Sequence, residues 1–216
     1  MNSKYELVLT DTKRHSGKTL YRIRALVAIG DTAAAGDLGG YVEGEKNLSP
    51  YGDAWVYGNA LVSGSARVSG NALVYGNAWV YGNALVSGSA LVYGDAQVSG
   101  IARVYGNARV YGNALVSGSA LVSGSARVYG DAQVSGNARV VKVSDMLQVG
   151  PAKSSGRFTT AHVDAEIGVR INCGCFSGTI KEFSDAIETT HAKNPEFLAQ
   201  YRLFCQLIAF NFGVTE

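Results

Sequence analysis

Cysteine is scarce in this chain of 216 residues, and long apolar runs are absent. The three cysteines, Cys173, Cys175 and Cys205, are odd in number and lack the spacing of a disulfide scaffold, which favours a reducing compartment. Residues 1–20 contain no apolar run long enough for a secretory leader, and no stretch approaches the length of about eighteen apolar residues that a membrane span needs. We therefore expect a cytoplasmic protein with no membrane partner.

Phenylalanine is also missing from most of the chain, because none of the seven precedes Phe158. Residues 51–140 lack proline, threonine, lysine, glutamate, histidine, cysteine and phenylalanine, and Pro50 and Pro151 stand on either side of this region. Such an abrupt change in residue types indicates two separate cores. We expect three parts: an N-terminal cap at 1–50, a β-solenoid at 51–150 and a small α+β unit at 151–216.

What the chain has in abundance is a repeat. Residues 51–140 consist of fifteen hexapeptides, each with Tyr or Ser, then Gly, then usually Asn, Ser or Asp, then Ala, any residue and Val. A unit this short cannot bury its apolar residues alone, so the copies must stack on one another. Alternation places Ala and Val inside, and glycine suits a corner because it tolerates positive φ. Three corners in eighteen residues predict a mainly β protein with a triangular parallel β-helix of about five coils.

The repeat resembles a known motif. An aliphatic residue followed four positions later by a small one occurs fourteen times, from Val56 with Ala60 to Val134 with Ala138. This pattern is similar to the hexapeptide repeat of left-handed parallel β-helix proteins, although Gly here stands two positions after the aliphatic residue, where that family often has it one position after. The left-handed coil is what the resemblance implies and does not follow from the residues themselves.

Two narrower resemblances involve the flanks. Residues 20–60, with Gly39-Gly40-Tyr41-Val42 and Gly52-Asp53-Ala54-Trp55-Val56, resemble the segment that leads into the solenoid of bacterial YdcK-like proteins, described as candidate acetyltransferases. The tail motifs Asn172-Cys173-Gly174-Cys175-Phe176 and Thr190-His191 are similar to a module of phage and prophage hexapeptide-repeat proteins. These resemblances imply the fold and a phage or prophage origin, but neither group has an established activity.

The N-terminal flank predicts a cover for the strand edges that a solenoid exposes at its end. Residues 5–10 and 19–29 have the apolar character of two strands, and Gly17 lies in the turn between them. We expect this segment to cap the first coil.

The C-terminal flank predicts a hairpin followed by two helices. Residues 157–164 and 166–172 form the expected hairpin. Thr179 and Glu182 make a capping box at the start of the first helix, and Asn194 precedes Pro195 at the start of the second. This unit either closes the last coil or supports a separate site.

The outward residues sort into three columns if three hexapeptides make one coil, and one column holds a ladder of tyrosines beside tryptophan, leucine and arginine. The candidate binding residues are Trp55, Tyr57, Tyr75, Tyr93, Arg109, Tyr111, Arg127 and Tyr129. So large an aromatic face favours a subunit contact. Two alternatives stay open: a ligand surface where tyrosines stack on bases or sugars while arginines meet phosphate, and a self-stacking structural ladder without a partner.

Catalytic groups are missing from the repeat, which contains no histidine and no inserted loop. Resemblance to the hexapeptide-repeat acyltransferases would imply both, and zinc chemistry needs several histidine ligands. Turn geometry accounts for the polar corner residues without a metal. The tail offers the catalytic candidates His162, Cys173, Cys175 and His191, because a Cys-x-Cys with a histidine can bind a metal or form a nucleophile and base pair. We favour core filling for the cysteines and a helix-end role for His191.

The leading hypothesis is therefore a non-catalytic, phage- or prophage-derived β-solenoid, homodimeric or homotrimeric, whose flat tyrosine-rich face serves protein assembly or binding. A second hypothesis is a module that binds a nucleotide or nucleic acid and acts against a host pathway, which the formal net charge of +2 neither demands nor excludes. A third is an acyltransferase, favoured by fold analogy and disfavoured by the missing histidine and loop. We expect no metal, and no cofactor except acetyl-CoA under the third hypothesis.

Overall fold

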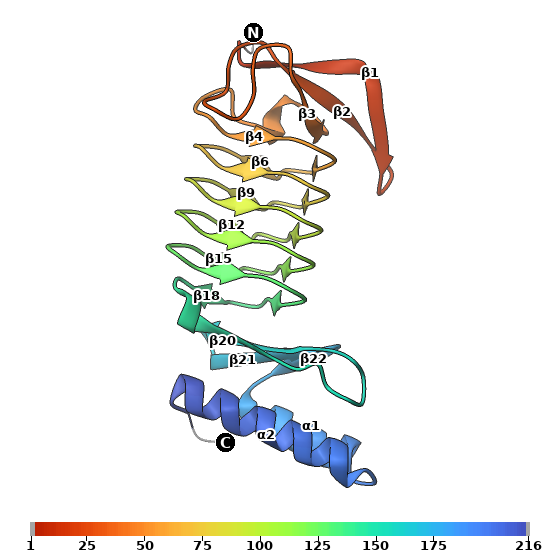
Figure 1. Ribbon diagram of the computed structural model, residues 1–216, viewed down its shortest axis with the longest axis vertical. Helices are drawn as coiled ribbons and strands as arrows, with labels where there is room; N and C mark the ends of the chain where they lie inside the picture. Colours follow the sequence, from red (N-terminus) through yellow and green to blue (C-terminus); the bar gives the residue numbers. More distant parts are fainter. Residues whose placement is uncertain (1–2, 215–216) are drawn as a thin grey trace.

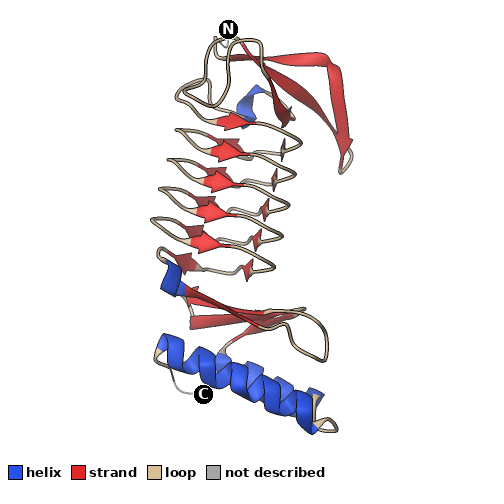
Figure 2. Ribbon diagram, viewed as in Figure 1, coloured by secondary structure: helices blue, strands red, loops and turns tan. Residues whose placement is uncertain are grey.

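The computed structural model describes residues 3–214 and shows an elongated rod (Figure 1). A parallel β-solenoid of about six turns forms the shaft, with an N-terminal hairpin at one end and a small sheet backed by two helices at the other. Each repeat strand is short, and turns make up the rest of each coil (Figure 2). No helix in the described part of the chain is long and apolar enough to cross a membrane. The mainly β class and the β-helix predicted from the repeat are confirmed.

Three parallel sheets form the sides of the shaft, because strands eighteen residues apart pair in register, as Leu91 does with Leu73 and Arg109. The ladder face consists of β4 (Trp55–Val56), β7 (Leu73–Val74), β10 (Leu91–Val92), β13 (Arg109–Val110) and β16 (Arg127–Val128). The hairpin face contains β5 (Leu61–Val62), β8 (Trp79–Val80), β11 (Gln97–Val98), β14 (Leu115–Val116) and β17 (Gln133–Val134). The third face consists of β6 (Arg67–Val68), β9 (Leu85–Val86), β12 (Arg103–Val104), β15 (Leu121–Val122) and β18 (Arg139–Val140).

The interior of the shaft is filled by the alanines and valines of the repeat, each no more than 1 % exposed from Ala54 to Val140. The corners need glycine for two reasons that Gly88 illustrates. Its φ is +66°, and a Cβ there would lie 2.8 Å from the amide nitrogen of Gly106 in the next coil. Glycine therefore permits both the turn and the close stacking of corners.

The solenoid begins before the regular repeat. β3 (Leu38–Val42) pairs in parallel with β5, and Leu48 bridges to Val68, with the short 3-10 helix η1 (Glu45–Asn47) between them. Residues 38–49 thus form most of an additional coil. The prediction of about five coils is corrected to about six turns, because this first coil uses an irregular sequence that a period search does not detect.

The N-terminal strands β1 (Tyr5–His15) and β2 (Lys18–Ala25) form the expected hairpin, but β1 is longer than predicted and β2 ends before residue 29. A register shift between Val8 and Thr12 marks an irregularity of the kind that bends a hairpin. Its tip extends down the shaft (Figure 1), where His15 meets Trp79 edge-on at a ring-centroid distance of 4.3 Å. The hairpin therefore covers one side of the shaft as well as its end.

The C-terminal unit is an antiparallel four-stranded sheet packed against two helices. Its elements are η2 (Val143–Asp145), β19 (Met146–Val149), β20 (Thr159–Asp164), β21 (Gly168–Cys173), β22 (Phe176–Gly178), α1 (Ile180–Thr190) and α2 (Pro195–Phe212). The predicted hairpin, the Thr179–Glu182 capping box and the Asn194 N-cap are confirmed. A second apolar core, separate from the shaft's, is confirmed as well. The unit starts with β19, inside the segment expected to belong to the solenoid.

The two ends of the shaft present opposite backbone groups. Within the coils the strand N–H groups donate to carbonyls of the following coil, as Trp55 does to Ala72 at 3.0 Å. The first coil therefore presents carbonyls without a coil partner, and side-chain donors cover them. Lys4 Nζ donates to the Ala54 carbonyl at 2.6 Å, and the Tyr5 hydroxyl donates to that of Leu48 at 2.8 Å.

The last coil presents N–H groups, and side-chain acceptors from β20 cover them. The N–H groups of Gln133, Ser135 and Asn137 donate to Thr160 Oγ1, His162 Nε2 and Asp164 Oδ2, respectively. The three acceptors alternate along β20 and so share one face of its sheet. The C-terminal unit thus closes the last coil through a strand.

Candidate interaction surface

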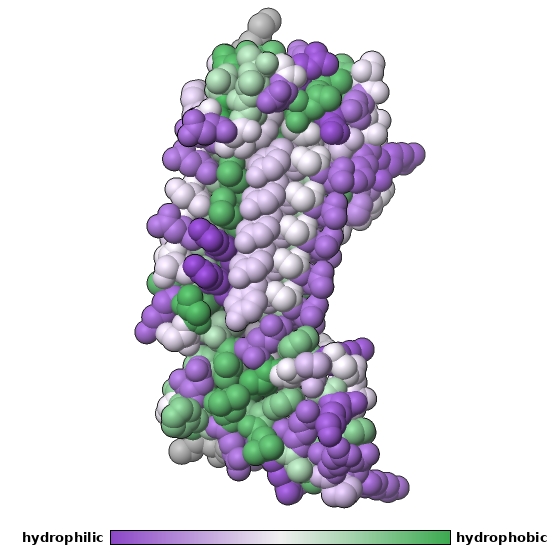
Figure 3. Space-filling model, viewed as in Figure 1, coloured by the Kyte–Doolittle hydropathy of each residue, from purple (hydrophilic) through white to green (hydrophobic). Residues whose placement is uncertain are grey.

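Five tyrosines stack in an unbroken ladder down the ladder face, one from each coil of the repeat: Tyr57, Tyr75, Tyr93, Tyr111 and Tyr129. Successive ring centroids are 4.8, 4.8, 5.0 and 5.6 Å apart, and the first three pairs are parallel within 6°. The first three spacings are close to the distance of about 4.8 Å between paired strands, so the backbone repeat imposes the stack, and the last pair is wider. In Figure 3 the ladder is the column of pale stacked side chains along the shaft.

The tyrosine rings cover one another but keep their outer edges accessible. Tyr57, Tyr75, Tyr93 and Tyr111 are half-buried, and Tyr129 is 41 % exposed. Burial raises the pKa values of Tyr57 and Tyr75, and the neighbouring tyrosine in each case adds to the rise. The hydroxyl groups of these two residues therefore stay protonated at neutral pH and can both donate and accept hydrogen bonds.

One column beside the ladder changes character along the shaft. Trp55 was expected to belong to the open surface. It is instead only 1 % exposed and packs edge-on against Tyr5, because the N-terminal segment covers it. Leu73 and Leu91 follow as half-buried residues, and Arg109 and Arg127 are exposed.

The column on the other side of the ladder is a line of amides and carboxylates at the corners: Asn59, Asn77, Asp95, Asn113 and Asp131. Hydrogen bonds join some of them between coils. Asn77 Nδ2 donates to Asp95 Oδ1 at 3.0 Å, and Asn113 Nδ2 donates to Asp131 Oδ1 at 2.9 Å. Turn geometry alone was expected to explain these residues. The structure adds contacts between coils, which the eighteen-residue spacing could have indicated.

The hairpin face differs because the chain covers its own aromatic side chains there. Trp79 stacks on Tyr81 at 3.8 Å, donates from Nε1 to Ser63 Oγ at 3.3 Å and receives His15 from the hairpin tip. Trp79 and Tyr81 are half-buried, as most ladder tyrosines are, but within residues 3–214 no ring contact like that of His15 is found on the ladder tyrosines.

His162, a candidate catalytic residue, has a structural position. It is fully buried, its Nε2 accepts from Ser135 N–H and lies 3.1 Å from Asn172 Nδ2, and its Nδ1 lies 3.2 Å from the Val163 carbonyl. These contacts fit a neutral ring with its proton on Nδ1. Burial lowers the pKa of His162, and the nearby Arg170 charge acts in the same direction, against the Val163 hydrogen bond and Asp164.

Asp164 is the third of the β20 side chains, after Thr160 and His162, that accept hydrogen bonds from N–H groups of the last coil. Its buried carboxylate receives Arg170 Nε at 2.7 Å. Burial alone would raise the pKa of Asp164, but hydrogen bonds from Arg170 and from the N–H groups of Glu166 and Ile167 outweigh it and hold the pKa below its usual value.

The other catalytic candidates, Cys173, Cys175 and His191, line one cavity of about 200 Å³ between the β21–β22 turn and the helices. Its further lining includes Phe183 and Tyr201, and the His191 ring stacks on Tyr201 at 4.9 Å. The structure thus brings these three candidates into one mainly apolar cavity and leaves His162 outside it. Among the described residues, no group of three or more His, Cys, Asp or Glu side chains is arranged to hold a metal ion.

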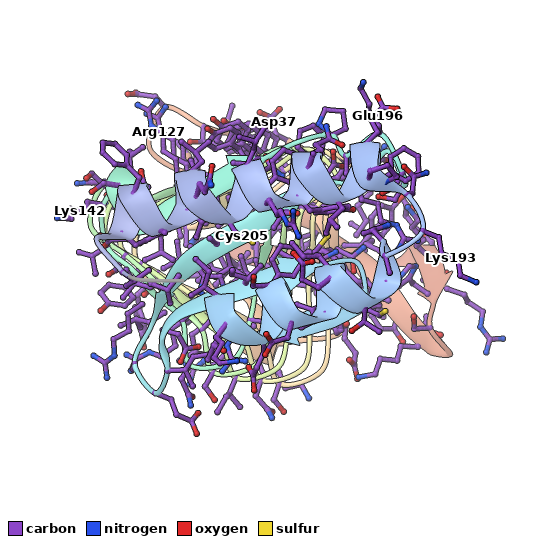
Figure 4. All side chains as sticks on the ribbon, turned by 90° about the horizontal axis from the view of Figure 1, so that it is seen from below. Asp37, Arg127, Lys142, Lys193, Glu196 and Cys205 are labelled. Atoms are coloured by element: carbon purple, nitrogen blue, oxygen red, sulfur yellow. The ribbon has the colours of Figure 1, made fainter. Side chains whose placement is uncertain are left out.

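Two further surface features escaped the sequence analysis. A cleft of about 650 Å³ lies where the last coil meets the C-terminal unit, and its lining includes Asp131, Arg157 and Phe158. Helix α2 also exposes an apolar stripe: Leu203, Leu207 and Phe210. Figure 4 shows α2 on the same side of the rod as Arg127. The spacing of the stripe could have revealed it, whereas the cleft arises from segments distant in sequence.

These features together define the class: the chain is a repeat β-helix protein with a three-sided shaft. Six segments of it match the model of the YdcK beta-solenoid repeat: 54–68, 66–82, 78–94, 102–118, 108–124 and 132–142. The match supports a β-solenoid repeat of this type for residues within 54–142, whereas the YdcK-like resemblance was predicted for the entry segment at 20–60, which the match overlaps only at 54–60. The matched segments end at residue 142 and do not reach the C-terminal unit, whose likeness to a phage module stays a prediction. No curated protein matches the chain.

Proposed function

We propose that this protein is a non-catalytic β-solenoid scaffold whose ladder face binds a protein surface, in self-assembly or with a partner. The main support for the proposal is the row of five stacked tyrosines with accessible ring edges. Successive ring centroids in this row are 4.8 to 5.6 Å apart. No hydrogen bond from the described residues reaches the ladder hydroxyls. Tyrosines that offer apolar rings and unsatisfied hydroxyl groups together are typical of protein interfaces.

The stacking of the ladder favours a protein over a nucleotide. A base that stacks on tyrosine needs an open ring face. In the ladder each inner ring is covered on both faces, with centroids 4.8 to 5.6 Å apart. Insertion of a base would require about 7 Å between rings, twice the rise between stacked bases. The accessible parts of these inner rings are their edges and hydroxyls, which suit another protein.

The histidine positions support a non-catalytic role over acyl transfer. His15 packs on Trp79 at the hairpin tip, His162 caps the last coil from a buried position, and His191 stacks on Tyr201. Hence none of the three stands beside an open acceptor pocket on the shaft, where the acyltransferase hypothesis requires a base.

Native mass spectrometry of the protein isolated from its source host tests the proposal. The test variant replaces Tyr75, Tyr93 and Tyr111 with serine, which the repeat already carries at this position in other hexapeptides. The control variant makes the same change at Tyr81 and Tyr105, on the other two faces. We expect the wild type and the control in complexes, here or, for a weakly associating second copy, at up to about 1 mM in sedimentation velocity, with the ladder variant as a monomer. A wild type that is monomeric in both experiments, or a ladder variant that keeps its partners, would overturn the proposal.

A further inference from the structure

We propose that the occupant of the ladder face is a second copy of this chain, lying parallel to the first about a two-fold axis that runs along the tyrosine ladder. This inference rests on the proposed function, because it names the partner of the same surface. Two-fold contacts are self-complementary, so a residue on one side of the axis meets a different residue on the other side of the partner.

The ladder face has the required layout because its two edges carry opposite charge. The tyrosine column is central, with the leucine and arginine column two residues before it and the amide and carboxylate column two residues after it. The exposed arginines, Arg109 and Arg127, lie on the first edge. The exposed carboxylates, Asp95 and Asp131, lie on the second. None of the ion pairs in the described part of the chain uses these four residues.

Parallel packing brings one kind of opposite-charge pair together, Arg127 with Asp131, while Asp95 is set against Leu91. Arg127, Tyr129 and Asp131 belong to one turn of the ladder and stand at one height. Rotation about an axis along the ladder therefore sets Arg127 of each copy against Asp131 of the other, in two equivalent pairs. Arg109 is set against the hydrogen-bonding side chain of Asn113. Each tyrosine meets its own equivalent, and their hydroxyls can donate to and accept from one another.

Antiparallel packing in full register is disfavoured by the same charges. It would set each column against the same column of the partner, with the order of coils reversed. Asp95 in the middle coil would face the second copy's Asp95, and like charges directly opposite each other repel. Arg109 would face Leu73, and Arg127 would face the buried Trp55 position. The charge pattern therefore selects the parallel arrangement.

The size of the face predicts a weak, concentration-dependent dimer. The ladder is about 20 Å high, and even if the four residues between the outer columns were fully extended over about 13 Å, the contact plane would cover at most about 260 Å². Even with a corrugated surface this is below the roughly 800 Å² per partner of a standard stable interface. We expect half-association in the range of about 10 µM to 1 mM.

Sedimentation velocity of purified protein over about 5 µM to 1 mM, with charge-reversal variants, tests the inference. Arg127→Glu and Asp131→Lys should each raise the dimer dissociation constant about tenfold or more, because each single change sets like charges together twice per dimer. The double variant should restore association, since the reversed pairs attract again. Arg67→Glu, the same change on the third face, should have no effect. Circular dichroism checks that every variant is folded.

The outcomes separate the two proposals. Restoration in the double variant supports the parallel pair, because antiparallel copies would not bring positions 127 and 131 together. Absence of a dimer up to about 1 mM, or a double variant that associates no better than the single ones, overturns the second-copy inference. If native mass spectrometry then still shows a different protein lost from the ladder variant, the proposed function stands without the inference.

Discussion

The ladder face and the hairpin face share one backbone repeat and one interior, but the chain treats them differently. On the hairpin face, the N-terminal hairpin covers Trp79, and β20 side chains accept hydrogen bonds from the last strand, β17. On the ladder face, Trp55 at the start lies under Tyr5, and the tyrosines below it keep their ring edges accessible. The chain thus covers parts of the hairpin face with its own N- and C-terminal segments. The tyrosines of the ladder face stay accessible to a partner.

We expect the largest loss of stability from a substitution in the interior of the shaft, because both faces share that interior. Val98 is fully buried in the shaft, and Val98→Asp would put an unpaired carboxylate there at a cost of about 4 kcal/mol or more. We expect loss of the cooperative unfolding transition in denaturant, followed by circular dichroism. The neighbouring change Gln97→Asp, on the outward side, should cost about 0.5 kcal/mol or less. Equal unfolding midpoints for the two variants would refute the arrangement of inward and outward positions.

The next largest loss of stability should come from removing a side-chain acceptor that caps the last strand of the hairpin face. His162→Ala leaves the Ser135 N–H without its acceptor, which should cost about 1 to 3 kcal/mol in the free energy of unfolding. Ser144→Ala, an exposed position in η2, is the control and should leave stability almost unchanged. A loss no greater than that of the control would show that β20 does not cap the shaft.

The same residue gives the cap a pH dependence with a definite sign. Because burial lowers the pKa of His162 in the folded state, the unfolded chain binds more protons as the pH falls below about 6.5. Stability from the neutral ring is complete above that pH and is lost as the pH falls toward the lower folded-state pKa. Urea unfolding at about pH 7.5 and about pH 5.5 should show a steeper loss for the wild type than for His162→Ala. Parallel losses would contradict a buried neutral His162.

A smaller loss of stability should come from removing the contact between the hairpin tip and the upper part of the hairpin face. His15→Ala removes the edge-on contact with Trp79 and should cost about 0.5 to 1.5 kcal/mol. The fluorescence maximum should also shift to the red as Trp79 becomes hydrated, since Trp55 stays buried under Tyr5. Thr19→Ala, at an exposed position of the same hairpin, should leave the spectrum unchanged. An unshifted spectrum for His15→Ala would mean that the tip does not cover Trp79.

The smallest effect concerns the open face. Tyr129 ends the ladder with one stacked neighbour, so Tyr129→Ser should cost only about 0.2 to 1 kcal/mol in thermal unfolding of the dilute protein. Ser117→Ala, at the equivalent position of the hairpin face, serves as the comparison. A cost above about 2 kcal/mol would exceed a single cross-strand pair and favour the alternative of a purely structural ladder.

Periodicity explains what the sequence could predict and where prediction stopped. The alternation of Ala and Val and the eighteen-residue spacing of the tyrosines gave the interior and the ladder, because both depend only on neighbouring coils. The first coil at 38–49 has no period, and the contact of His15 with Trp79 joins segments that no local pattern relates. These features depend on tertiary packing and became visible only in the structure.

The end cap shows how a structural residue can resemble a catalytic one. A histidine in a tail that also carries three cysteines is a reasonable candidate for chemistry. Its neighbours along β20 hold the missing signal: Thr160, His162 and Asp164 alternate as polar residues on a strand whose other side includes Ala161 of the second core. An alternating row of acceptors on one strand face is what the N–H groups of a last coil require.

Tyrosine-directed chemical footprinting, read by mass spectrometry, tests most directly whether the ladder face is open in the isolated chain and covered at work. In dilute purified protein, the hydroxyls of Tyr75, Tyr93 and Tyr111 should react readily, with the 81 % exposed Tyr51 as the internal reference. In cells of the source host, or in purified protein at about 1 mM if the partner is a second copy, the account predicts protection of these three with Tyr51 unchanged. Reactivity equal to that in dilute solution under both conditions would contradict the central claim that a protein occupies the ladder.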